Sequence, residues 1–245
     1  MTLLHTPQFS SWVRGHLLCR VEDVPGLVAL TFDDGPSAAN TPRVLDLLAR
    51  HDAHATFFTL AQNVNRHPEI IRRMVAEGHE VAIHGELHLP LLLLPPPLIR
   101  REIERSASAV KRAADVTAAH YRPPFGLMLP SQARFVRALG YTSVLGDVYP
   151  EDAYQPPVDR IVARVMPRLS AGSILILHDG SPIGQPSRAR TVEALAIILR
   201  NMAARALKGV SVERLLAAAG VEDAPGRTGA DAVVRTEQTR GAPRC

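Results

Sequence analysis

The chain has 245 residues, of which 46% are hydrophobic and 21% are charged, and its formal net charge is +4. This length and apolar content suffice for one domain with a full core and exclude a long disordered chain. Acidic and basic residues are interleaved, and no dense Lys/Arg stripe with aromatic residues occurs. A nucleic-acid partner is therefore not expected.

The two ends of the chain differ in composition from its body. Residues 1–26 form a lead-in segment that lacks the basic start, apolar run and small-residue cleavage site of a secretory signal, which favours a cytoplasmic location. Residues 221–245 show no apolar period and are expected to be a mobile tail. Between them we expect a single domain over residues 27–220. The oligomeric state is left open.

Neither a membrane span nor a disulfide framework is predicted. The densest apolar run, Leu91–Leu94, is stopped by Pro95–Pro97, far short of the roughly 20 residues that a membrane helix needs. The two cysteines, Cys19 and Cys245, lie near opposite ends of the chain. We expect both to be free thiols, because no spacing indicates a disulfide scaffold.

From residue 27 to about residue 216, β-rich runs alternate with amphipathic helical stretches, which is typical of a parallel α/β domain. The predicted strands are Val28–Phe32, Ala55–Leu60, Glu80–His84, His120–Arg122, Thr142–Leu145, Ser173–His178 and Val210–Ser211. The predicted helices are Pro42–His51, Pro68–Glu77, Pro97–Ala114, Ser131–Leu139, Val158–Leu169 and Ser187–Leu207. Six or seven βα units favour a single-domain, distorted (β/α) barrel of about seven parallel strands, although periodicity alone also fits an open sheet.

Two adjacent carboxylates, Asp33 and Asp34, follow the first predicted strand in the sequence TFDDGPS at residues 31–37. Catalytic groups of parallel α/β folds collect at this carboxyl end of the strands. Strand neighbours point to opposite faces, but Gly35 lets the backbone turn and aim both acids into one site. One acid can then bind a metal while the other accepts a proton. An isolated Asp-Asp-Gly is more often a plain polar turn.

The third predicted strand ends in two histidines, His84 and His88, four positions apart. Such a pair can converge on one ion, and neutral imidazole is the commonest nitrogen ligand of zinc. One carboxylate of the first cluster would complete a His-His-Asp set with open positions for water and substrate. Taken alone, H-x-x-x-H is a weak signal, because the chain has ten histidines.

Three further strand ends carry polar chemistry. Arg122 opens the sequence RPPFG and can keep a catalytic carboxylate ionised. The segment after Leu145 offers Asp147, Glu151 and Asp152 as acids, and His178 ends the strand LILH. Each segment alone has a structural explanation, but five polar strand ends in succession predict one catalytic site.

In order and spacing these five segments resemble the polysaccharide deacetylase family, the NodB-homology carbohydrate esterases that include chitin, chitooligosaccharide and peptidoglycan N-acetylglucosamine deacetylases. The resemblance covers residues 27 to about 216, so residues 27–220 become the expected catalytic domain. It implies a hydrolase that removes N-acetyl groups from an amino sugar or oligosaccharide and releases acetate. The implied cofactor is one divalent metal ion, Zn²⁺ first and Co²⁺, Ni²⁺ or Mn²⁺ otherwise.

The resemblance also implies a role for each site residue. Asp33 would be the general base held by Arg122, and His178 the general acid tuned by Asp152. The implied metal ligands are Asp34, His84 and His88. The backbone N–H of Phe125 would stabilise the oxyanion. The implied substrate-binding side chains are Phe125, Tyr149 and Leu177.

The chain departs from the family pattern at two positions. The family usually has Ser or Thr after the first histidine, where this chain has Gly85 and lacks the supporting hydroxyl. The family usually has Trp beside the acid of the fourth segment, where this chain has Ala153 after Asp152. We therefore expect the metal loop and the substrate preference to differ from those of typical members.

Two other functions fit parts of the pattern. The same metal site can hydrolyse a different, cyclic amide, which a panel of cyclic and acyclic amides distinguishes. A catalytically inactive glycan-binding domain is the second alternative, and it is disfavoured because Asp33 and His178 are both present. In each case the molecule that the protein is expected to bind is an N-acetylated carbohydrate or a related amide.

Overall fold

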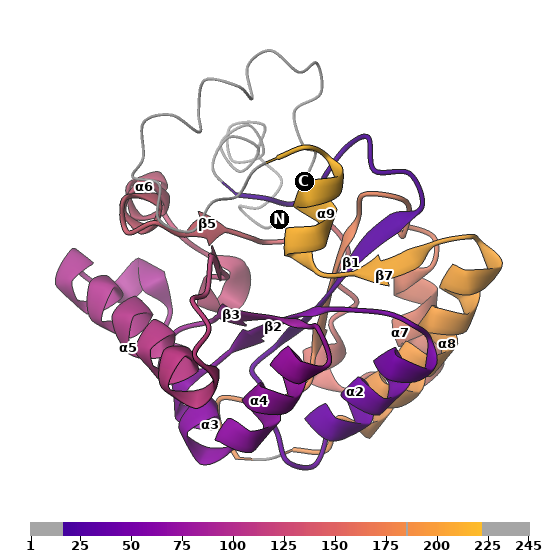
Figure 1. Ribbon diagram of the computed structural model, residues 1–245, viewed down its shortest axis with the longest axis horizontal. Coiled ribbons are helices and arrows are strands. Elements are labelled where there is room, and N and C mark those ends of the chain that lie inside the picture. The colour runs from indigo at the N-terminus through magenta and orange to yellow at the C-terminus, as the bar shows by residue number, and fades with distance from the viewer. Residues whose placement is uncertain (1–16, 185, 222–245) are drawn as a thin grey trace.

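The computed structural model describes residues 17–184 and 186–221 and has seven parallel strands in one sheet. The strand order is β5-β4-β3-β2-β1-β6, and β7 pairs with β1. The strands are β1 (Leu27–Asp33), β2 (Thr56–Thr59), β3 (Glu80–Ile83), β4 (His120–Tyr121), β5 (Thr142–Ser143), β6 (Ile174–His178) and β7 (Lys208–Val210). The sheet curls on itself inside a layer of helices (Figure 1). The predicted α/β barrel is thus confirmed.

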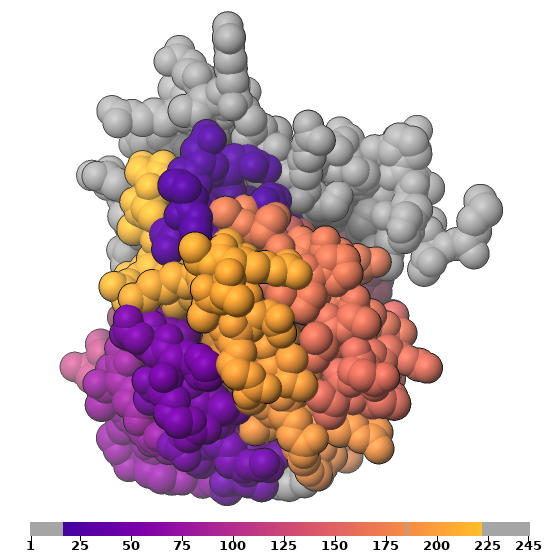
Figure 2. All heavy atoms as spheres, turned by 90° about the vertical axis from the view of Figure 1, so that its right-hand side faces the viewer, coloured from indigo at the N-terminus to yellow at the C-terminus, as the bar shows by residue number. Residues whose placement is uncertain are grey.

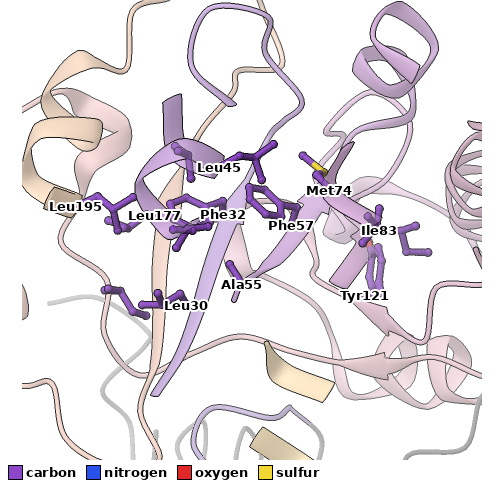
Figure 3. Packing of buried hydrophobic residues seen from close by; sticks show 14 of the residues in the cluster. Leu30, Phe32, Leu45, Ala55, Phe57, Met74, Ile83, Tyr121, Leu177 and Leu195 are labelled. Carbon is purple, nitrogen blue, oxygen red and sulfur yellow. The ribbon is translucent and has the colours of Figure 1, made fainter. Parts of the chain in front are cut away.

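Strand β1 pairs with three other strands, β2, β6 and β7, and nearly every residue of its sequence LVALTFD is buried. Leu30 and Phe32 point outward into the main core, where Phe32 stacks on Phe57 with ring centroids 5.2 Å apart (Figure 3). Ala29 belongs to a second cluster inside the barrel. Because strand side chains alternate, Asp33 shares the inner face with Ala29.

Eight helices surround or cap the strands within the described residues. They are α2 (Thr41–Arg50), α3 (Ala61–Arg66), α4 (Pro68–Ala76), α5 (Pro96–Ala114), α6 (Pro130–Ala138), α7 (Val158–Val165), α8 (Ala189–Ala204) and α9 (Val212–Ala218). Short 3₁₀ turns are η2 (Leu91–Leu93), η3 (Pro124–Gly126) and η4 (Asp152–Tyr154). On one side of the barrel α8 lies between α2 and α7 (Figure 2).

The sequence prediction missed α3 and α9, which are six and seven residues long. Helices this short show no full apolar period. The predicted strand Val210–Ser211 is also corrected, because β7 ends at Val210 and the Ser211 hydroxyl caps α9 by accepting a hydrogen bond from the Arg214 N–H at 3.2 Å. Helix α9 packs three apolar side chains against the inner cluster and so fills the amino end of the barrel: Val212, Leu215 and Leu216.

The barrel closes between β5 and β6 through the segment just before β1. Leu18 bridges Val144 in parallel, and Arg20 bridges Ser173 in antiparallel fashion. The Arg20 guanidinium also donates hydrogen bonds to Asp147 at 2.9 Å and to the Ser173 hydroxyl at 2.7 Å. Part of the expected lead-in segment therefore belongs to the barrel wall.

The structure bears on the predictions about the cysteines, the C-terminal tail and a membrane span. Cys19 is disulfide-bonded, so the prediction of a free thiol at this position is wrong. Cys245 and nearly all of the expected tail lie outside the described residues. Among residues 17–184 and 186–221, no helix has the length and apolar character needed to cross a membrane.

Gly172, in the turn before β6, provides a test of the closing contact. Its φ is +84°, and a Cβ there would overlap the carbonyl oxygen of Val21. We expect Gly172→Ala to lower the free energy of unfolding by more than about 2 kcal/mol, because left-handed backbone alone costs roughly 1–2 kcal/mol. Urea unfolding measures the loss. Gly220→Ala is the control, since φ is +70° there with nothing within 4 Å; equal losses would contradict the clash.

Candidate functional site

Polar side chains from four strands meet at the carboxyl end of the barrel. Asp33 is the last residue of β1 and lies in register beside His178, the last residue of β6. His84 and Arg122 directly follow β3 and β4, and their side chains are almost completely buried. Because all strands run parallel, these four groups share one edge of the sheet.

Asp34, His84 and His88 form a compact group with the chemistry of a metal site. The Nε2 atoms of His84 and His88 lie 3.7 and 3.5 Å from Asp34 Oδ1, and one ligand atom from each residue fits within 4.8 Å of the others. Zinc bound tetrahedrally at about 2.0–2.1 Å separates its ligand atoms by roughly 3.3 Å. Asp34 Oδ1 is buried without a hydrogen-bond partner among the described residues. The three residues therefore fit one divalent cation.

Hydrogen bonding and burial prepare both imidazoles to act as ligands. His84 Nδ1 lies 2.7 Å from the Arg122 carbonyl oxygen. A carbonyl only accepts, so Nδ1 carries the proton and Nε2 presents its lone pair toward Asp34. Burial lowers the pKa of His84, and burial together with the neighbouring His84 lowers the pKa of His88 to about 4. Both rings are neutral at pH 7.

Among the described residues, the ion-pair partners of the Asp34 carboxyl are the two imidazoles of His84 and His88, not an arginine or lysine. Burial raises the pKa of Asp34, although His178 and His88 act in the opposite direction. A cation bound beside this carboxyl would favour its ionised form. The backbone of Asp34 is held by Asn63, whose side-chain amide donates to the Asp34 carbonyl at 2.8 Å. No sequence pattern predicts this contact.

Asp33 is kept ionised by a buried arginine. Arg122 Nη1 donates to Asp33 Oδ1 at 2.6 Å and to the Thr31 hydroxyl at 2.8 Å. The guanidinium carbon lies 4.0 Å from the centre of the Phe58 ring. Burial alone would raise the pKa of Asp33, but the charge and hydrogen bond of Arg122, together with the charge of His178, outweigh it and the pKa is lowered. Asp33 can therefore accept a proton at neutral pH.

His178, unlike Asp33, carries a proton at neutral pH. Its Nδ1 donates to Asp152 Oδ1 at 2.9 Å, and its backbone N–H donates to Asp152 Oδ2 at 2.9 Å. Burial favours the neutral ring, yet the charge and hydrogen bond of Asp152 prevail and raise the pKa of His178 to about 9. The imidazole is thus protonated at pH 7 and can give up a proton.

The structure distinguishes the three acids that the sequence left open beside His178. Asp152 is fully buried against His178 and also accepts from the Thr191 hydroxyl at 2.9 Å. Asp147 bonds instead to Arg20. Glu151 forms an ion pair with Arg164 at 2.8 Å. Geometry therefore assigns the partner of His178 to Asp152.

Of the three expected substrate-binding side chains, two lie near the site and one does not. Phe125 is 62% exposed and its ring centroid is 4.5 Å from that of His88. Tyr149 is partly exposed, with its ring 6.0 Å from that of His178. Leu177 is fully buried in the outer core (Figure 3) and is not placed to contact substrate.

Strand alternation explains the error at Leu177. Residues two apart share a face of a strand, so Ile176 faces the same way as His178 and Leu177 faces away. Ile176 is the apolar residue of β6 next to His178 on that face, and it lies outside the main core cluster. The alternation rule, applied to LILH, was a signal that could have found it.

Arg188, which the sequence did not indicate, joins the fourth and fifth segments. It is 5% exposed, and its guanidinium donates to the carbonyls of Gly180 at 2.9 Å and Ala153 at 2.8 Å. Ala153 is held through its backbone, so this loop is anchored without the usual tryptophan side chain. Arg188 stands in a polar, aperiodic stretch, which gives no sequence signal for such a contact.

A parallel barrel that carries an ionised acid, a protonated histidine and an Asp-His-His group at one end indicates a hydrolytic enzyme. A family model described as polysaccharide deacetylase matches residues 20–144. The chain is 40% identical over 187 residues to a chitooligosaccharide deacetylase of Bradyrhizobium sp. (strain ANU 289), covering 72% of this chain and 85% of that protein. It is 32% identical over 204 residues to a peptidoglycan-N-acetylglucosamine deacetylase of Bacillus cereus, covering 82% and 93%.

A solved structure supports the same relationship. The Xyl-CE4 domain of a multidomain xylanase from the hindgut metagenome of Trinervitermes trinervoides superposes with a TM-score of 0.74 at 31% identity, covering 83% of this chain and 95% of that one. The chain therefore belongs to the polysaccharide deacetylase family and is a hydrolase that acts on amide bonds. The resemblance inferred from five motifs is confirmed.

The Asp152–His178 pair generates a prediction that needs no substrate. Asp152→Asn removes the nearby negative charge, so the pKa of His178 should fall from about 9 by more than about one unit. Titration of the ring by ¹⁵N NMR in metal-free protein measures the shift. Asp147→Asn is the matched control, because Asp147 contacts Arg20 rather than His178. An unchanged pKa in Asp152→Asn would refute the assigned pair.

Proposed function

We propose that this enzyme removes N-acetyl groups from an amino sugar within an oligosaccharide and releases acetate, using one divalent metal ion. The observation that carries the proposal is the arrangement of Asp33, ionised, and His178, protonated, around an Asp-His-His group with an unpartnered buried oxygen. The named activities of the relatives, chitooligosaccharide and peptidoglycan-N-acetylglucosamine deacetylation, support the substrate class.

Asp34, His84 and His88 are the proposed metal ligands. We favour Zn²⁺, because two neutral imidazoles and one carboxylate suit it, with Co²⁺, Ni²⁺ or Mn²⁺ as alternatives. When bound, the ion supplies positive charge that polarises a carbonyl oxygen and lowers the pKa of a water molecule. His84 is pre-oriented for this role by the Arg122 carbonyl.

Asp33 and His178 are the proposed proton carriers. Asp33 accepts a proton from the attacking water, whose oxygen forms a bond to the acetyl carbon. His178 then donates its Nε2 proton to the amide nitrogen as the carbon–nitrogen bond breaks, because an unprotonated amine leaves poorly. The products are acetate and a free amino sugar. Arg122 holds Asp33 in place, and Asp152 holds His178.

Phe125 and Tyr149 are the proposed contacts for substrate. Both are aromatic side chains with exposed surface beside the site, and aromatic rings pack well against the apolar faces of sugars. The backbone N–H of Phe125 is proposed to stabilise the oxyanion. Ala153, where the family usually has Trp, leaves this part of the site with a smaller side chain and is expected to alter substrate preference.

Metal dependence is tested by binding and by activity together. Purified protein should bind about one Zn²⁺ per chain, and dialysis against a chelator should abolish acetate release from N-acetylchitooligosaccharides until Zn²⁺ is restored. His84→Ala and His88→Ala should each weaken Zn²⁺ binding strongly, since each removes one of three ligands. His67→Ala is the control, because this ring lies away from the group and interacts with Glu69. Full activity in chelated protein would refute metal dependence.

The proton carriers are tested by separating binding from chemistry. Asp33→Asn and His178→Ala should lower kcat by about 10²- to 10⁴-fold while the protein still binds Zn²⁺. Acetate release is measured on a panel of acyclic N-acetylated sugars and cyclic amides. Cleavage of cyclic amides alone would favour a different amidase. Glycan binding without turnover in the unaltered enzyme would indicate an inactive binding domain.

A further inference from the structure

The loop of residues 84–88, which carries two of the proposed metal ligands, has an unusual backbone. Gly85 has a φ of +93° and His88 a φ of +60°, a left-handed conformation that side-chain-bearing residues rarely adopt. Such a conformation persists where neighbouring groups over-determine it. Gly85 offers no hydroxyl for this purpose.

Helix α5 supplies the missing support from behind the loop. Glu102 Oε2 accepts hydrogen bonds from the backbone N–H groups of Glu86 at 2.9 Å and Leu87 at 3.2 Å. The Ser106 hydroxyl donates to the Gly85 carbonyl at 3.1 Å. Residues four apart share one face of a helix. Glu102 is 8% exposed and Ser106 is fully buried, so these contacts are shielded from water.

Helix α3 bonds to the same loop from another direction. The N–H groups of Ala61 and Gln62 donate to the carbonyls of Gly85 at 3.1 Å and Glu86 at 3.3 Å. Helices α3 and α5 pack against each other (Figure 1). The loop carbonyls therefore bind α3, and the loop amides bind the Glu102 carboxylate. Removing that carboxylate leaves two amides without their acceptor.

We propose that Glu102, assisted by Ser106, is a positioning residue that fixes the 84–88 loop and thereby sets the metal affinity of the Asp34-His84-His88 group. The inference rests on the proposed metal site and assigns this chain's replacement for the hydroxyl lost at Gly85. A carboxylate suits the task, because charge-assisted hydrogen bonds are about twice as strong as neutral ones. Partners behind metal ligands typically change metal affinity by about 10- to 100-fold.

The test measures Zn²⁺ affinity of the full metal-free chain by competition with a chromogenic chelator. Glu102→Ala should weaken binding by about 10- to 100-fold, whereas Glu102→Gln, which keeps an acceptor oxygen in place but loses the charge, should weaken it clearly less than Glu102→Ala does. Glu104→Ala is the matched control on the same helix, because Glu104 is exposed and pairs with Arg100. The visible spectrum of the Co²⁺-loaded protein reports coordination geometry and should change in Glu102→Ala alone.

If Glu102 only stabilised the fold, a different outcome would be expected. Its removal would then lower the unfolding midpoint of the metal-free protein without changing Zn²⁺ affinity or the Co²⁺ spectrum, and that result overturns the proposal. Should Glu102→Ala fail to fold, Glu102→Asp withdraws the carboxylate by one methylene, and an unchanged affinity there also overturns it. An unaltered protein that binds no Zn²⁺ refutes the proposed metal site itself, which distinguishes the two failures.

Discussion

The burial of carboxylates at the end of β1 and β6 is the constraint on which the site depends. A buried charge is costly unless a partner compensates it. Asp33 has Arg122, which itself stacks on Phe58, and Asp152 has His178. Asp34 Oδ1 and Asp179 Oδ1 are both buried without a hydrogen-bond partner among the described residues, and Asp34 Oδ1 also faces the Nε2 atoms of His84 and His88 at 3.7 and 3.5 Å. An added cation would satisfy the Asp34 oxygen and both imidazoles together, which is why we propose Asp34 as a metal ligand rather than a structural acid.

The same constraint gives three histidines at one barrel end different protonation states. His84 and His88 have lowered pKa values because burial disfavours their charge. His178 is buried as well, but the adjacent Asp152 reverses the effect and raises its pKa to about 9. Groups whose surroundings push their pKa values apart can act as base, ligand and acid in one reaction. The proposed direction of proton transfer, from water to Asp33 and from His178 to the amide nitrogen, is consistent with these surroundings.

Sequence patterns predicted the strand ends, and with them most of the site, because parallel strands end at one edge. They did not predict where the chain turns: Gly35 was expected to aim both acids, yet the left-handed residue is Asp34 itself, with a φ of +71°. The choice of Asp152 required tertiary contacts, since three acids follow one strand. The role of Arg188 also required tertiary contacts, because its partners are the backbone carbonyls of two loops, at Gly180 and Ala153. The error at Leu177 had a different cause, because strand alternation along β6 already pointed to Ile176 instead.

Support of the metal loop through backbone amides has a consequence for specificity. Glu102 accepts its hydrogen bonds from the backbone N–H groups of Glu86 and Leu87. Substitutions at those two positions therefore leave the hydrogen bonds to Glu102 in place. Leu87 is 48% exposed immediately before His88, while Glu86 pairs with Arg105 on the outside. Under the proposed function, the loop can therefore vary its exposed side chains while the backbone that carries the proposed metal ligands stays fixed.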